Sequence, residues 1–238
     1  MTIVLPCPMP PQRKIAIVGK AGSSLGLAPY GDENWQIWTL SDLVLAHQAP
    51  RYEVQFELHD AALVQQRPLY WEWLARCEPA KPIYMRQAHP DIKASVDYPI
   101  NEIVSEFGGY FTNTVSYMIA LAIAMKPETI GVWGVDMACS AEYRAQRPSC
   151  EYFLGIAKGM GIEIIVPPQA DLLKTCGLYA FDDKVSDLAA KCKARADELK
   201  ARIQEASQRR DQAACDAAYL QGALEDTSEY WSQWFHQS

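Results

Sequence analysis

The sequence lacks the motifs that mark several common protein classes. It has no C-x-x-C pair among its seven cysteines, no G-x-G-x-x-G or G-x-x-x-x-G-K-[ST] motif, and no run of 18 apolar residues. These absences argue against a cysteine zinc site, a dinucleotide fingerprint, a P-loop ATPase and a membrane-spanning helix. Scattered, unpaired cysteines fit free thiols in a reducing compartment.

A basic excess is absent too. The chain has 22 basic and 29 acidic residues and a formal net charge of −7. We therefore do not expect it to bind nucleic acid mainly by neutralising phosphates. Residues 1–12 contain four prolines and lack the basic start and long apolar core of a signal peptide. We predict a cytoplasmic protein with no membrane partner.

The composition divides the chain into parts. With 238 residues, of which 49% are hydrophobic, it can bury one sizeable core and carry an appendage. From residue 185 the sequence turns charged and rich in alanine, without proline. We predict a flexible lead at 1–12, a nucleotide-binding domain at 13–180 and a long helical tail at 185–238.

Short β-rich apolar segments alternate with helical ones, as in a mostly parallel sheet flanked by helices. The predicted strands are residues 14–18, 36–40, 52–58, 82–85, 129–135 and 162–167. The predicted helices of the domain are residues 62–77, 100–107, 114–125 and 151–160. The fold class is therefore α/β, a Rossmann-like sheet followed by a long coiled-coil-like helix.

The clearest pattern is the helix–strand unit at residues 110–137. Asn113 and Thr114 open an apolar helix, and the strand after it ends in Gly134 and Asp136. Helix N-caps can hold an anion or a ribose, and parallel strands open into a ligand crevice at their carboxyl ends. We predict a ligand site there, although any α/β domain can contain such a unit for structural reasons alone.

A glycine- and serine-rich turn follows the first predicted strand directly. Such turns present backbone N–H groups to phosphates. The candidate phosphate-binding residues are Gly19, Gly22, Ser23 and Ser24. The alternative is a tight turn in which a serine only caps the next helix.

Histidine is scarce, and His59 has the most informative position of the four. It follows the strand at 52–58, whose carboxyl end should point into the crevice. We predict that His59 is a general base, with a structural histidine as the alternative. The polar loop at 86–99 either covers the site or only connects two elements.

Residues 138–148 are polar and aromatic and follow the crevice strand. They predict a lid that clamps a charged ligand through Glu142, Tyr143 and Arg147. The alternative is a solvated loop.

The tail has a heptad pattern over about five repeats, interrupted by Arg210. Its two apolar positions are Ala189, Ala196, Ile203, Ala217 and Leu224, and Cys192, Leu199, Ala206, Ala213 and Leu220. Such a seam needs a partner, so we predict a homo-oligomer through residues 185–224 or docking on the globular body. The cluster at Tyr230–Phe235 should also pack on something.

The order of these segments resembles a known family. The strand with its Gly/Ser turn, T-N-T before an apolar helix, and G-V-D-M before a polar segment are similar to family-42 sialyltransferases and to motility-accessory and 6-hydroxymethylpterin diphosphokinase-like proteins. W-x-I/L-W-x-L, F-E-L-H and E-Y-x-x-Q-R-P segments resemble a group of phage-encoded proteins. Here these are Trp35–Leu40, Phe56–His59 and Glu142–Pro148.

The resemblance implies a Rossmann-like glycosyltransferase that binds a nucleotide or nucleotide sugar without a metal or other cofactor. By analogy Gly19–Ser24 would face the phosphates, and Tyr143 and Arg147 would stabilise the leaving nucleotide. The chain has no histidine between His89 and His236, where the sialyltransferases carry their base. The resemblance therefore leaves His59, Asp136 or Glu142 as the base.

Two functions follow from these observations. The first is a nucleotide-dependent transferase, specifically a metal-independent glycosyltransferase. The alternative is a non-catalytic phage protein, located in the host cytoplasm, that binds a nucleotide or docks on a host protein through its coiled tail.

Overall fold

The computed structural model describes most of the chain. The described residues are 14–137, 141–175, 178, 181 and 185–235, with the side chains of 141–144, 185–191 and 235 outside the description. The predicted lead at 1–12 lies outside the described residues. The chain divides into two units, Met1–Lys174 and Thr175–Ser238.

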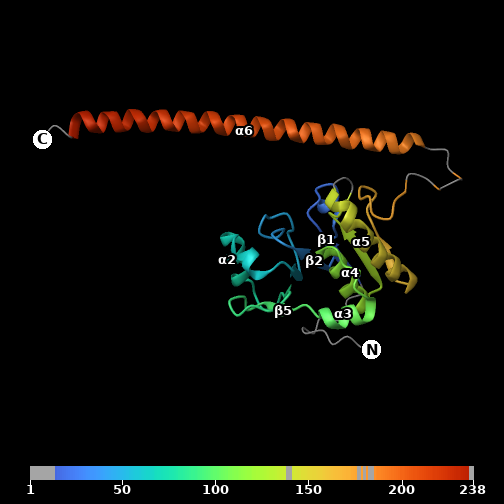
Figure 1. Cartoon of the computed structure of the whole chain (residues 1–238). Helices are drawn as coiled ribbons and strands as arrows, with labels where there is room; N and C mark the ends of the chain where they lie inside the picture. The colour runs from blue at the N-terminus through green and yellow to red at the C-terminus, as the bar shows by residue number, and fades with distance from the viewer. Residues whose placement is uncertain (1–13, 138–140, 176–177, 179–180, 182–184, 236–238) are drawn as a thin grey trace. The chain divides into compact units, whose positions relative to one another are not determined.

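The first unit contains a seven-stranded parallel sheet (Figure 1). Its strand order is β5-β4-β3-β2-β1-β6-β7. The strands are β1 Lys14–Val18, β2 Trp35–Leu40, β3 Val54–Glu57, β4 Ile83–Met85, β5 Ser95–Asp97, β6 Thr129–Trp133 and β7 Glu163–Ile165. The predicted α/β fold with a parallel sheet is confirmed.

The order of the strands fixes where a crevice forms. The chain adds β2 to β5 on one side of β1 and then crosses to add β6 and β7 on the other. The connections therefore leave β1 and β6 in opposite directions, which makes their carboxyl ends the topological switch point of the sheet. The turns after β1 and β6 meet at this point.

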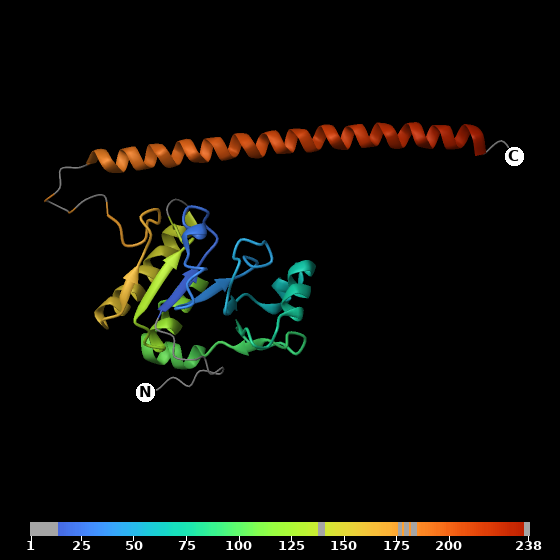
Figure 2. The ribbon, with the colours of Figure 1, turned by 180° about the vertical axis from the view of Figure 1, so that it is seen from behind.

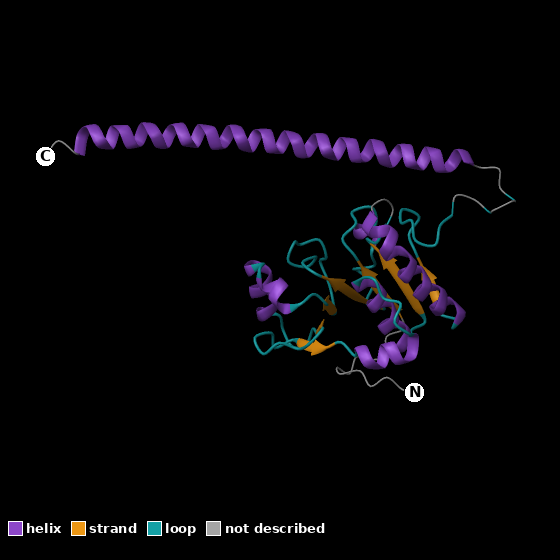
Figure 3. Ribbon diagram, viewed as in Figure 1, coloured by secondary structure: helices purple, strands orange, loops and turns teal. Residues whose placement is uncertain are grey.

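Helices cover one face of the sheet (Figures 2 and 3). They are α3 Ile100–Phe107, α4 Thr114–Ala124 and α5 Ala141–Gly159. Most side chains of α4 are fully buried, which explains its almost uniformly apolar sequence. Ile15 and Ile17 of β1 and Phe153 of α5 belong to the same buried cluster as α4.

On the opposite face, α1 Ala61–Gln65 and α2 Pro68–Arg76 pack on β4, and shorter segments cover β1, β2 and β6. Leu25, in the 3₁₀ helix η1 Leu25–Leu27, and Leu43 pack on the second buried cluster. The Trp133 ring lies over Gly131, where a Cβ atom would come within 2.2 Å of the indole. A glycine in this central strand therefore makes room for a tryptophan on the face that has no long helix.

Three elements differ from the sequence predictions. The single helix predicted at 62–77 is two helices, α1 Ala61–Gln65 and α2 Pro68–Arg76, because Pro68 starts a new first turn. The loop predicted at 86–99 contains β5, an edge strand with polar residues. The segment predicted as a lid or a solvated loop at 138–148 is largely helical. Helix α5 begins at Ala141 and continues through Pro148.

The second unit contains one helix of 51 residues, α6 Val185–Phe235. At 1.5 Å per residue it is about 76 Å long. No helix among the described residues is long and apolar enough to cross a membrane.

Candidate functional site

The turn after β1 is fastened to the end of β6. Gly19 N–H donates to the Trp133 carbonyl and Ala21 N–H donates to the Gly134 carbonyl, each at 2.8 Å. The buried Ser24 hydroxyl accepts from Gly134 N–H at 2.8 Å. The two turns that were predicted to bind one ligand are therefore adjacent.

Two of the predicted ligand residues are glycines for a steric reason. A Cβ atom on Gly19 would lie 2.5 Å from the Gly134 carbonyl oxygen. A Cβ atom on Gly134 would lie 2.3 Å from the Gly19 carbonyl oxygen, and Gly134 has a φ of +63°. Both residues allow the two backbones to approach, a role that the sequence alone does not separate from ligand binding.

The exposed tip of the turn is the part open to a phosphate. Gly22 and Ser23 are exposed, and a Cβ atom on Gly22 would meet nothing within 4 Å. In the part of the chain that the structure describes, their N–H groups have no backbone acceptor. The Ser23 hydroxyl donates to the carboxylate of Asp136, at the end of β6. Three predicted residues thus come together here.

The side chain at the start of α4, Asn113, forms hydrogen bonds with other protein groups. Asn113 caps the helix, its Oδ1 accepting from Ser116 N–H at 2.9 Å. Its Nδ2 donates to the Gln146 carbonyl of α5, also at 2.9 Å. Thr114 is the first residue of α4. The side chain of Asn113 therefore joins α4 to α5, and its ligand role stays a prediction.

Arg147 fixes the end of the first unit. Its Nε lies 2.7 Å from a Glu151 oxygen, and its guanidinium also donates to the Lys174 carbonyl at 2.9 Å. The same Glu151 oxygen accepts from Leu173 N–H at 2.8 Å. The side chains of Glu142 and Tyr143 lie outside the described residues. The predicted lid residues are thus on α5, and their action on a ligand stays a prediction.

A buried carboxylate orients His59. The Glu57 side chain is 1% exposed, whereas His59 is 56% exposed, and its Nδ1 lies 2.5 Å from Glu57 Oε1. A carboxylate only accepts, so in the neutral imidazole this contact favours the tautomer with the hydrogen on Nδ1 and the lone pair on Nε2. The Tyr70 hydroxyl interacts with Glu57, and burial, followed by the Glu57 charge, raises the Tyr70 pKa. Glu57 Oε2 itself is buried without a well-aligned hydrogen bond among the described residues.

His59 borders a cavity of about 540 Å³ at the carboxyl ends of β3 and β4. Met85 and the rings of Tyr98 and Tyr117 give it apolar surface, and Arg86 supplies a guanidinium. Burial raises the pKa of Tyr98 well above its ordinary value, and its hydroxyl donates to the Tyr117 carbonyl at 2.8 Å. The cavity therefore combines aromatic walls with an oriented imidazole.

Two cations at this edge were not predicted from the sequence. Lys20, in the β1 turn, and Arg67, just before α2, both form ion pairs with Asp42 after β2. Partial burial acts to raise the Asp42 pKa, but the hydrogen bonds and charges of Lys20 and Arg67 lower it below its usual range. Lys20, Asp42 and Arg67 are far apart in the sequence, so only the fold shows that their side chains meet.

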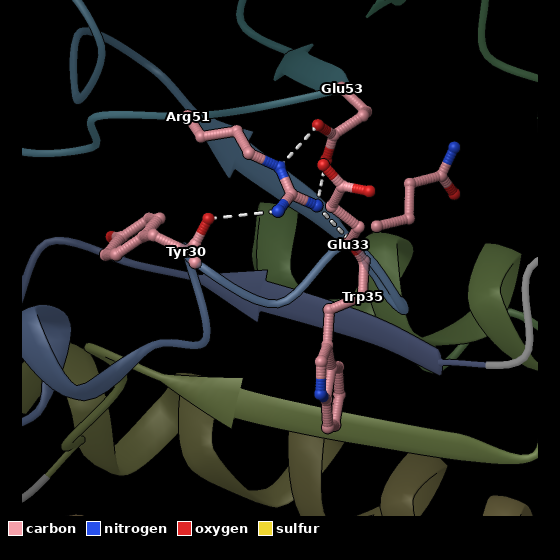
Figure 4. Close-up of a pocket in the computed structure, with 7 residues that line it drawn as sticks. Tyr30, Glu33, Trp35, Arg51 and Glu53 are labelled. Carbon is pink, nitrogen blue, oxygen red and sulfur yellow. Dashed lines mark hydrogen bonds and ion pairs between the residues drawn. The ribbon is translucent and has the colours of Figure 1, made fainter.

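A second cavity, of about 430 Å³, lies at the amino ends of β2 and β3 (Figure 4). Arg51 donates to the Tyr30 carbonyl at 2.9 Å and to Glu53 Oε1 at 2.8 Å. Glu53 Oε2 accepts from Ile37 N–H at 2.7 Å. These charged groups are satisfied by the protein itself, so we assign this cavity a structural role.

No protein-family model matches the sequence, and no curated protein sequence matches it. Among solved structures, the chain is similar to the sialyltransferase CstII from Campylobacter jejuni in complex with the substrate analogue cytidine-5'-monophosphate. The identity is 13%, the TM-score 0.46, and the match covers 66% of this chain and 81% of that one. The chain is also similar to the monofunctional alpha-2,3-sialyltransferase Cst-I from the same organism. Here the identity is 15%, the TM-score is 0.46, and the match covers 79% of this chain and 95% of that one.

The thiamine pyrophosphokinase from Bacillus subtilis is also similar, with 16% identity, a TM-score of 0.38, and coverage of 65% of this chain and 60% of that one. At these identities the likeness concerns the path of the chain only. Sialyltransferases of the family that the sequence resembles are thus among the structural neighbours. The likeness to phage proteins stays a prediction.

No group of three or more His, Cys, Asp or Glu side chains that could hold a metal ion occurs within the described ranges.

Proposed function

We propose that the chain is a nucleotide-dependent transferase, a metal-independent glycosyltransferase that uses a nucleotide-sugar donor. The observation that carries this proposal is the Glu57–His59 pair beside a cavity, at the same edge of the sheet as the β1/β6 switch point. Transfer of a sugar from a nucleotide to a hydroxyl requires a base for the hydroxyl proton and a site for the departing phosphate. Both can be supplied at this edge of the sheet.

The donor phosphate would bind at the exposed tip of the β1 turn. The N–H groups of Gly22 and Ser23 point to no backbone acceptor there, which suits an anion. Lys20 and Arg67 add positive charge, at present shared with Asp42. Asp136, which accepts from Ser23, would position the turn and accept from a ribose hydroxyl. These groups would stabilise the charge that develops on the departing phosphate.

The acceptor would occupy the cavity beside His59. As its hydroxyl oxygen bonds to the anomeric carbon, His59 Nε2 takes the hydroxyl proton. The bond from the anomeric carbon to the phosphate oxygen breaks, and its electron pair leaves with the nucleotide. Glu57 stabilises the imidazolium that forms, because its carboxylate already accepts from Nδ1. Asp136 and Glu142 remain alternative bases.

A thermal-shift screen against nucleotides and nucleotide sugars tests the donor site. A ligand that binds only the folded state raises the melting temperature. The panel includes cytidine-5'-monophosphate, which is named with one of the sialyltransferase structures. We expect a shift with at least one ligand, and we expect Asp136→Ala to weaken that ligand about tenfold or more, the loss of about one charge-assisted hydrogen bond.

The outcome that contradicts the donor site is equally clear. If Asp136→Ala retains the full ligand shift, then Asp136 has no part in nucleotide binding. Glu128→Ala, which removes an exposed carboxylate just before β6, at the opposite end of that strand from Asp136, serves as the control for loss of charge.

Gly22→Ala tests the phosphate contact separately from stability. The added methyl group meets no protein atom, so the unliganded protein should melt within a few degrees of the unsubstituted chain. It would stand where a phosphate approaches the backbone, so nucleotide affinity should fall about tenfold or more. Gly26→Ala, also in open space, is the matched control. Equal affinity in both variants would contradict phosphate binding at the tip.

A non-catalytic nucleotide-binding protein is the second candidate function. It is favoured by Asn113 and Arg147, two predicted site residues whose hydrogen bonds are used within the protein. Nucleotide binding with no release of nucleotide from any donor, in the presence of sugar and peptide acceptors, would identify this function. The predicted docking on a host protein through the tail belongs to this candidate.

A further inference from the structure

The helix α6 carries an exposed apolar seam that continues past the predicted heptads. Beyond the heptads, which end at Leu224, the helix carries an aromatic group of Tyr230, Trp231 and Trp234. Trp231 and Trp234 fall on the same two heptad positions as Ile203 and Leu220, and all four are 59–69% exposed. We call this surface the α6 seam. Its six large members are Leu199, Ile203, Leu220, Leu224, Trp231 and Trp234.

Charge is distributed unevenly along the same helix. Residues 192–210 contain six basic and three acidic side chains, a net charge of +3. Residues 211–235 contain five acidic side chains and no basic ones, a net charge of −5. One half of the helix is therefore complementary in charge to the other half.

We propose that α6 pairs with α6 of a second copy of this chain as an antiparallel coiled coil. In a parallel pair, the two positive halves face each other and so do the two negative halves. In an antiparallel pair, each positive half faces a negative half. The charge distribution thus selects both the partner, a second copy, and the orientation. This proposal stands independently of the proposed catalysis.

Arg210, the charged interruption of the seam, favours the same orientation. A parallel in-register pair would place two Arg210 side chains in one layer of the interface. An antiparallel pair centred between residues 210 and 213 sets each Arg210 against Ala213 of the other copy. The guanidinium can then reach solvent while keeping its ion pair with Asp211, at 2.7 Å.

The same centre brings the large apolar residues together. Ile203 of one copy meets Leu220 of the other, and Leu199 meets Leu224, so the two ends of the seam pair large with large. The middle of the seam, with Ala206, Ala213 and Ala217, lets the helices approach closely. One register therefore satisfies charge, Arg210 and side-chain volume together.

The oligomeric state of the full chain gives the first test. Light scattering coupled to size exclusion should give a dimer, and Ile203→Asp should give a monomer because it places a carboxylate in the seam. Gln204→Asp makes the same charge change at the next residue, off the seam, and should leave the dimer intact. A monomeric unsubstituted chain, or equal loss of the dimer in both variants, would overturn the proposal.

Disulfide mapping tests the orientation. In an antiparallel pair, Cys192 lies opposite position 231, whereas the two Cys192 residues are about 58 Å apart along the helix axis. Mild oxidation of Trp231→Cys should join Cys192 to position 231 of the other copy, seen as a cross-linked peptide by mass spectrometry. A Cys192–Cys192 link would instead show a parallel pair and refute the antiparallel one.

Discussion

Replacing His59 by glutamine is expected to lower the turnover of nucleotide-sugar donor by about 10²- to 10⁴-fold, the usual contribution of a general base. The reason is the lone pair on Nε2, which the Glu57 contact at Nδ1 leaves free to accept a proton. Nucleotide affinity should stay nearly unchanged, because His59 borders the acceptor cavity and not the β1 turn. The measurement is the rate of nucleotide release with a saturating donor.

His47→Asn provides the control for this experiment. His47 is exposed and has a φ of +55°, a conformation that asparagine tolerates. Turnover should be unaffected there. If His59→Gln retains full turnover, His59 is a structural residue and the base must be sought at Asp136 or Glu142.

Glu57→Gln separates positioning from proton transfer. A glutamine can hold the ring but cannot stabilise the imidazolium, so kcat should fall while KM for the donor is kept.

Replacing Gly134 by alanine is expected to destabilise the first unit by about 3 kcal/mol or more. The residue has a positive φ, and its new Cβ atom would lie 2.3 Å from the Gly19 carbonyl oxygen. Backbone atoms cannot move aside as a flexible side chain does. For a unit of this size, the melting temperature should fall by about 6–12 °C.

Near-ultraviolet circular dichroism is the suitable probe of this melting, because α6, with 51 residues, supplies about half of the helical signal in the far ultraviolet. Gly26→Ala, whose Cβ atom meets nothing within 4 Å, should melt within a few degrees of the unsubstituted chain. A Gly134→Ala protein as stable as this control would show that the β1 and β6 turns do not meet as described.

Periodicity predicted the elements with strong apolar patterns. The segments 14–18 and 114–124 are mostly apolar, and both became largely buried elements with nearly the predicted bounds. The edge strand β5 was missed because it has only three residues, two of them polar, and none is fully buried. The start of α5 was missed because a proline normally ends a helix, whereas α5 continues through Pro148.

The candidate site could be predicted only in part, for a similar reason. The Gly/Ser turn, Asp136 and His59 lie at strand ends, and strand ends follow from the local pattern. The meeting of Lys20 with Arg67 depends on the order of strands in the sheet, which local patterns do not contain. Arg147 was predicted to bind a ligand together with Glu142 and Tyr143, because sequence does not show that its guanidinium pairs with Glu151; its role on a ligand stays a prediction.

Binding of nucleotide at the turn after β1 is the central claim, and backbone amide chemical shifts measure it most directly. A ¹H–¹⁵N spectrum of the assigned protein is recorded with increasing amounts of the nucleotide that gives the largest thermal shift. Our account predicts the largest changes at the amides of Gly22 and Ser23, with smaller ones at Gly134–Asp136. Changes confined to the Arg51 cavity at the opposite edge, or no saturable changes at all, would contradict it.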